Sequence, residues 1–224
     1  MTNDFSLLKQ VVERLHTGVK YGKGQMVDQV LGAAEIAKTA GNPELEALAL
    51  LHKSQEKKRI SETQKPLTDD EIILLVDRAL GEGKGAKVVD ALKYMKTEPE
   101  DNDKAREQEM QLAWAAAAPE LVKQMLMVEK IVNFETSLRV LEALRDDPKL
   151  DGVKPPEWHK NYYITRWEMV EVALKDASPE LYDRAYRAGK EGTELASKLM
   201  PPERESWVER FKKDPSIAVG VYLD

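Results

Sequence analysis

The spacing of apolar residues along this chain is that of α-helices almost from end to end. Two clear series are Phe5, Leu8, Val12 and Leu15, and Leu121, Met125, Val128 and Val132. Intervals of three and four residues place side chains on one face of a helix. The alternation of apolar and polar residues that a half-buried strand requires is nearly missing, except over 217–223. The chain is therefore predicted to be all-α.

Residues that favour helix ends divide this pattern into about nine to ten helices. Thr68 with Glu71 three places later forms a capping box. Pro43 and Pro119 suit the first turn of a helix, and Gly41 suits the position just after one. The helices are predicted over 4–17, 25–40, 43–59, 72–80, 86–96, 104–117, 119–145, 158–175, 179–200 and 202–213.

Three sets of similar segments recur in the same order along the chain. The first helix of each set contains 12–15, 76–79 or 141–144, the second contains 26–31, 88–92 or 169–174, and the third opens with 42–45, 118–121 or 178–181. One interpretation is a unit of three helices that is used three times and stacks into an irregular helical repeat. The alternative is a compact multi-helix bundle, because a proline-glutamate-leucine opening suits any helix start.

The length and composition predict a single helical domain over 1–224. The chain has 224 residues, of which 42% are hydrophobic, and this is enough to form a core in one or two domains. If the repeat is real, the domain subdivides into a first unit over 1–60, a second over 68–145, a third over 146–213 and a tail over 214–224.

The composition also excludes classes of function. Cysteine is absent, which rules out a disulfide scaffold, thiolate metal ligands and a cysteine nucleophile. Residues 1–20 lack the apolar core of a signal peptide, and no apolar run approaches the ~20 residues that cross a bilayer. We expect a cytoplasmic protein, or one in the host cytosol if it is viral, with no membrane partner. The formal net charge of -6 argues against polyanion binding by the protein as a whole, although a local basic patch is compatible with it.

A glycine-lysine-glycine turn occurs twice, around Lys23 and around Lys84. Such a turn before a helix exposes backbone N–H groups, and the lysine adds positive charge, so it suits a phosphate or a carboxylate. It is not a nucleotide-binding P-loop, because no serine or threonine follows the lysine. The alternative interpretation is a short connection between helices, in which glycine supplies a positive φ and lysine supplies solubility.

The segment 154–167 concentrates aromatic and cationic residues. Its candidate binding residues are Trp158, His159, Tyr162, Tyr163 and Arg166. Aromatic rings beside cations can stack on bases or anchor a protein interface. In the repeat alignment this segment takes the place of the two glycine-lysine-glycine turns, so all three could lie along one edge. The alternative is that the aromatic rings only clamp a long loop onto the body of the protein.

Catalytic and metal-binding patterns are not found in the sequence. His16, His52 and His159 are far apart, and none forms the helical pair that a zinc site on a helix requires. The carboxylates are numerous, but no two stand out as an acid–base pair. We therefore predict no metal, no cofactor and no catalytic residue.

The sequence favours a non-catalytic protein that binds another macromolecule, most simply a protein partner, as an adaptor does. Its predicted contact surface carries Lys23, Lys84 and the aromatic residues of 154–167. The first alternative is a nucleic-acid-binding protein, such as a viral or phage nucleoprotein or a regulator, which would use the same surface. The second alternative is an enzyme with a site between helices. The oligomeric state is not determined by the sequence.

Overall fold

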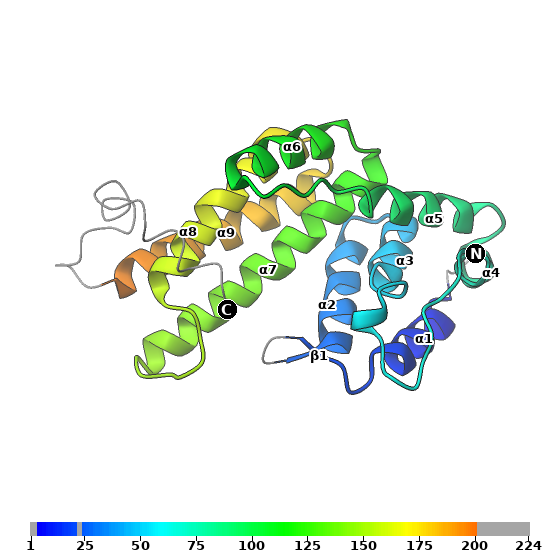
Figure 1. Ribbon diagram of the computed structural model, residues 1–224, viewed down its shortest axis with the longest axis horizontal. Helices are drawn as coiled ribbons and strands as arrows, with labels where there is room; N and C mark the ends of the chain where they lie inside the picture. Colours follow the sequence, from blue (N-terminus) through cyan, green and yellow to red (C-terminus); the bar gives the residue numbers. More distant parts are fainter. Residues whose placement is uncertain (1–3, 22–23, 201–224) are drawn as a thin grey trace. The chain divides into compact units, whose positions relative to one another are not determined.

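The computed structural model describes residues 4–21 and 24–200 (Figure 1). Within these ranges the chain forms nine α-helices, one 3-10 helix, one π-helical turn and one two-stranded hairpin, which confirms the predicted all-α class. The elements are α1 (Ser6–His16), β1 (Lys20–Tyr21), β2 (Gly24–Gln25), α2 (Met26–Thr39), α3 (Pro43–Leu51), η1 (Lys57–Arg59), α4 (Asp69–Leu80), α5 (Lys84–Met95), α6 (Lys104–Ala117), α7 (Glu120–Asp146), α8 (Pro156–Met169), the π-helical turn η2 (Val170–Leu174) and α9 (Pro179–Leu199). The predicted helix over 202–213 and the tail over 214–224 lie outside the described residues.

The helix ends follow the local chemistry of the sequence. The Thr68 side chain accepts from the Glu71 amide, and the Glu71 carboxylate accepts from the Thr68 amide, so the predicted capping box is confirmed. At the start of α3, the side-chain oxygen of Asn42 accepts from the amides of Glu44 and Leu45. Pro43 occupies the first turn of α3, where its missing N–H costs no hydrogen bond.

Three local features differ from the predicted helices. The hairpin β1–β2, with Lys20 opposite Gln25, replaces what the sequence indicated only as a break between helices. Helix α3 ends at Leu51 rather than at 59, and only 57–59 returns to a helical turn. The helix predicted over 158–175 changes from α to π geometry at Val170. A two-residue strand and a single wide turn are too short to leave a periodic signal.

The chain divides into two compact units. Within the described residues, unit 1 is drawn from Met1–Asn133 and Glu168–Tyr186, and unit 2 from Phe134–Trp167 and Arg187–Asp224. Helices α7, α8 and α9 therefore contribute residues to both units. The subdivision predicted from the repeat stays a prediction, and each unit is described by itself.

Helix α3 is the centre of unit 1. All of its residues from Leu45 to Leu51 are buried, and it contacts α1, α2, α4 and α5. Its sequence explains this position, because apolar residues are found on all sides of the helix rather than on one stripe. The one polar side chain among these buried residues is that of Glu46. It is 7% exposed, and burial raises the pKa of its carboxyl group.

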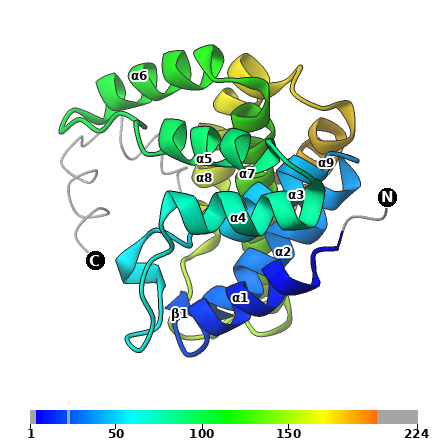
Figure 2. The ribbon, with the colours of Figure 1, turned by 90° about the vertical axis from the view of Figure 1, so that its right-hand side faces the viewer.

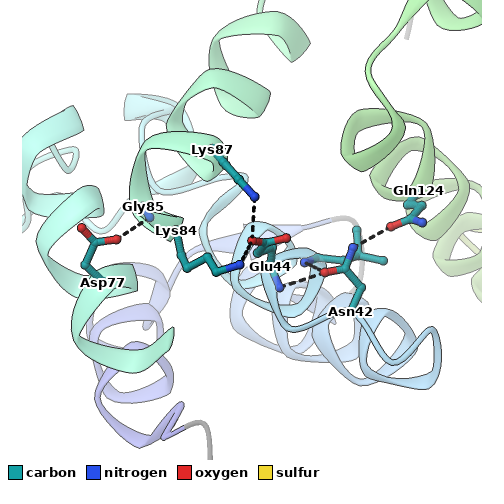
Figure 3. A network of polar contacts seen from close by, with 8 residues as sticks. Asn42, Glu44, Asp77, Lys84, Gly85, Lys87 and Gln124 are labelled. Carbon is teal, nitrogen blue, oxygen red and sulfur yellow. Dashed lines mark hydrogen bonds and ion pairs between the residues drawn. The ribbon is translucent and has the colours of Figure 1, made fainter. Parts of the chain in front are cut away.

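Helices α4 and α5 lie side by side (Figure 2). They approach closely at Gly85. A Cβ atom at this position would lie 2.5 Å from both the Cα atom and the carbonyl oxygen of Ile73. The side chain of Asp77 accepts a hydrogen bond of 2.6 Å from the Gly85 amide, so α4 supplies the cap that the first turn of α5 lacks (Figure 3). The absence of a side chain at Gly85 thus sets how closely the two helices pack.

We predict that Gly85→Ala destabilises the protein strongly. The added Cβ would meet the backbone of Ile73, which cannot turn aside as a side chain can, so a loss on the order of 2–4 kcal/mol is expected. Gly32→Ala is the matched control. Gly32 is an exposed residue of α2 with nothing within 4 Å of a Cβ, and alanine there should stabilise by roughly 0.5–1 kcal/mol. Urea unfolding of both variants measures the change in the free energy of unfolding. Equal changes for the two variants would contradict the close approach of Gly85 to the Ile73 backbone.

Candidate functional site

Three residues of α8 form a partly exposed row, which we call the α8 stripe: Trp158, Tyr162 and Arg166. They are four residues apart, so they lie along one side of the helix. The rings of Trp158 and Tyr162 stack with centroids 5.2 Å apart and an angle of 9° between their planes. The Arg166 guanidinium carbon lies 6.0 Å from the Tyr162 ring centroid, within the range of a cation–π interaction. All three side chains are half-buried.

The other two candidates on this helix, His159 and Tyr163, point into unit 2. Tyr163 is 1% exposed and donates a hydrogen bond of 2.7 Å to the carbonyl of Phe134, and burial raises the pKa of its hydroxyl to about 12. His159 is 4% exposed, and its Nδ1 contacts the hydroxyl of Ser137. Burial lowers the pKa of His159. These two side chains join α8 to α7 within unit 2.

The inward position of Tyr163 depends on a glycine of α9. A Cβ at Gly192 would collide with the Tyr163 ring, and a Cβ at Gly189 would be in ordinary contact with the Trp167 and Phe134 rings. From the sequence alone, these glycines are only residues of low helix propensity within a helix. Their spacing of three residues on one helix was the signal that could have indicated close packing.

Of the two lysines predicted to bind a partner, the structure describes only Lys84. Lys23 lies outside the described residues. Lys84, in unit 1, has its Nζ 2.7 Å from a carboxylate oxygen of Glu44, which also lies 3.4 Å from Lys87 Nζ (Figure 3). The Gly85 amide of the same turn is bonded to Asp77. The donors that suited an external anion are therefore engaged by the chain's own carboxylates.

The predicted common edge joins residues that the structure does not bring together in one unit. Trp158, Tyr162 and Arg166 belong to unit 2, whereas Lys84 belongs to unit 1. The stripe forms a group by itself, and the common edge stays a prediction.

We predict that Lys84→Glu lowers stability, because it places a carboxylate against that of Glu44. Both side chains are partly exposed, so solvent screening limits the expected loss to about 0.5–1 kcal/mol. In a Glu44→Gln background the same substitution should cost clearly less. A double-mutant cycle of thermal unfolding measures this coupling. Identical losses in the two backgrounds would show that the ion pair contributes nothing.

The histidines of unit 1 are buried and act in hydrogen bonds. His16 donates from Nδ1 to the carbonyl of Arg59 over 2.6 Å, and His52 donates from Nδ1 to the carbonyl of Ala49 over 2.7 Å. Burial lowers the pKa of His16 and lowers that of His52 to about 4, although Glu129 lies 3.8 Å from its Nε2. Both imidazoles are therefore neutral structural donors near neutral pH.

A charged cluster surrounds His52. Lys53 lies between two carboxylates, 3.1 Å from Glu56 and 3.5 Å from Glu129. Burial opposes the charge of Lys53, but the two carboxylates raise its pKa overall. Burial also opposes the charge of Glu129, but Lys53 and His52 lower its pKa overall. The cluster is internally compensated, which is typical of a structural ion-pair network.

We predict that acidification destabilises the protein through His52. Its pKa is about 4 in the folded state but ~6.5 in an unfolded chain, so the unfolded state takes up the proton first as the pH falls. The contribution of His52 to the free energy of unfolding is on the order of 3 kcal/mol. It is fully present above about pH 6.5 and is lost as the pH falls to about 4. Urea unfolding gives the free energy of unfolding at pH ~7.5 and at pH ~5. This free energy should differ less between the two pH values for His52→Gln than for the wild type. An unchanged difference would rule out His52 as the titrating group.

A cleft of about 200 Å³ lies in unit 1 beside the π-helical turn. Its lining residues are Ala116, Glu120, Lys123, Glu171, Val172, Ala173, Lys175, Asp176 and Ala177. The Glu171 carboxylate accepts from Lys175 Nζ over 2.8 Å and from the Tyr182 hydroxyl over 2.6 Å. No histidine is among these lining residues, and the Glu171 carboxylate is already paired with Lys175 and Tyr182.

The described ranges contain neither a cluster of metal-ligating side chains nor a membrane-spanning helix. Within 4–21 and 24–200, no group of three or more histidine or acidic side chains could hold a metal ion. None of the helices described is long and apolar enough to span a membrane. No protein family, curated protein or solved structure matches this chain.

Proposed function

We propose that this chain is a non-catalytic protein that binds another protein, as an adaptor does, through the α8 stripe. The observation that carries the proposal is the stacking of Trp158 on Tyr162, with both rings half-exposed and Arg166 beside them. Tryptophan, tyrosine and arginine are the residue types that contribute most binding energy in protein interfaces.

The packing of unit 2 supports this role of the stripe. His159 and Tyr163 anchor the same helix from its inward side, through Ser137 and Phe134. The stripe is thus presented by a helix that is held in place. Rings that are already ordered lose little conformational freedom on binding, which favours affinity.

The state of the titratable groups supports a non-catalytic function. The histidines donate to backbone carbonyls or contact a serine, and Lys53 and Glu129 neutralise one another. A general acid or base needs access to a substrate. Lys53 and Glu129 instead link the turn after α3 to α7.

The test compares Trp158→Ala with Trp114→Ala. Trp114 is a matched control, because it is also half-buried and stacks on Tyr94 with centroids 5.4 Å apart, but it belongs to α6 in unit 1. A partner captured by the wild-type protein is first identified and purified. Calorimetric titration should then show binding at least ~10-fold weaker for Trp158→Ala, which corresponds to ~1.4 kcal/mol, and within about twofold of the wild type for Trp114→Ala.

Two results would contradict the proposal. The first is an equal effect of both tryptophan substitutions, since this would reflect a general loss of structure; circular dichroism of each variant provides the check. The second is tight binding of single-stranded RNA or DNA that falls steeply with added salt. That result would establish the nucleic-acid alternative and displace the protein partner.

A further inference from the structure

Arg166 is a half-buried cation without a carboxylate partner among the described residues, in contrast to two other half-buried cations, Lys53 and Arg59. Lys53, with 21% of its side chain exposed, pairs with Glu56 and Glu129, and Arg59, with 31% exposed, lies 3.7 Å from Glu56. Among the residues that the structure describes, Arg166 makes no ion pair, and its one assigned interaction is with the Tyr162 ring. A guanidinium in this setting retains donors in the planar fork that matches a carboxylate.

We propose, on the basis of the function proposed above, that the α8 stripe binds an acidic, extended segment of the partner protein. In this arrangement a partner carboxylate pairs with Arg166, and an aromatic or long apolar side chain of the same segment packs against Trp158 and Tyr162. The exposed Lys154, four residues before Trp158, adds a second cation close to the stripe in sequence.

The helix geometry sets the spacing of the partner residues. With a rise of ~1.5 Å per residue, Arg166 lies ~6 Å along the axis from Tyr162 and ~12 Å from Trp158. An extended chain advances ~3.3 Å per residue and places alternate side chains on one face. The carboxylate and the apolar side chain should therefore be two or four residues apart in the partner.

The charge of the stripe favours an acidic protein segment over nucleic acid. Nucleic-acid binding draws on several cations that each neutralise a phosphate, whereas the stripe presents one guanidinium next to two rings. A protein segment needs only one carboxylate at this position. The formal net charge of the chain, -6, also disfavours a long polyanion.

The test uses two fluorescein-labelled peptides and the full chain. The first is Gly-Ser-Glu-Ser-Phe-Ser-Phe-Ser-Gly, whose glutamate stands two and four residues before the phenylalanines, and the second carries glutamine in place of glutamate. Fluorescence anisotropy should show at least ~5-fold tighter binding of the glutamate peptide to the wild type. Arg166→Gln should abolish that preference.

Lys160→Gln is the matched control for the lost charge. Lys160 also lies on α8 and is half-buried, but its position two residues from Trp158 and from Tyr162 places it on another side of the helix. The preference for glutamate should survive this substitution. Thermal unfolding of Arg166→Gln establishes that the variant is folded.

The outcomes separate this inference from the proposed function. Equal binding of the two peptides, with loss of both in Trp158→Ala, would overturn the acidic specificity and leave the stripe as a binding surface. No binding of either peptide to the wild type would also overturn the inference, while the titration of the natural partner decides the proposed function independently. Binding of a 12-nucleotide RNA that depends on Arg166 and is lost with salt would overturn both.

Discussion

Each unit of this protein depends on a place where one helix approaches another without an intervening Cβ atom. In unit 1 the approach is that of Gly85 to the backbone of Ile73, and in unit 2 it is that of Gly192 to the ring of Tyr163. The second contact determines what the α8 stripe can do. Since Tyr162 and Tyr163 are adjacent and differ by about 100° around the helix, the seating of Tyr163 against α9 orients Tyr162 and Trp158 toward the edge of the unit.

Several partly buried cations and donors of unit 1 lie against carboxylates of the same unit. Lys84 lies against Glu44, Lys53 lies between Glu56 and Glu129, and the first turn of α5 is capped by Asp77. A cation that is partly removed from water is costly unless a carboxylate accompanies it. Arg166 has an aromatic face in place of a carboxylate. That difference supports the proposals made for the stripe, and no comparable residue stands out among the cations that the sequence highlighted.

Much of the fold follows from the sequence, and the reasons are local. Thr68, Pro43 and Asn42 act within a few residues of themselves, so their effects on helix ends are predictable. The residues that decide packing act between helices rather than within one. The bond from the Gly85 amide to Asp77 and the contact of Gly192 with Tyr163 depend on how helices come together. A periodic pattern identifies the face of a helix but not its partner.

The candidate site shows the same limit. The aromatic and cationic composition of 154–167 indicated a special segment, but composition does not show which side chains are buried. His159 and Tyr163 proved to be internal, whereas Trp158, Tyr162 and Arg166 are half-exposed. Lys84 illustrates the converse case, because a glycine-lysine-glycine turn does not reveal the carboxylate 40 residues earlier in the chain that pairs with it.

The burial of α3 on all sides has a consequence for biosynthesis. Two of the helices that cover it, α1 and α2, precede it in the chain, whereas α4 and α5 follow and are complete only at Met95, 44 residues after Leu51. At a ribosomal rate of about 5–20 residues per second, the apolar helix waits roughly 2–9 s for its remaining cover. During that interval the nascent chain presents a leucine-rich surface, so this stretch is where a chaperone would be expected to act before the first unit closes.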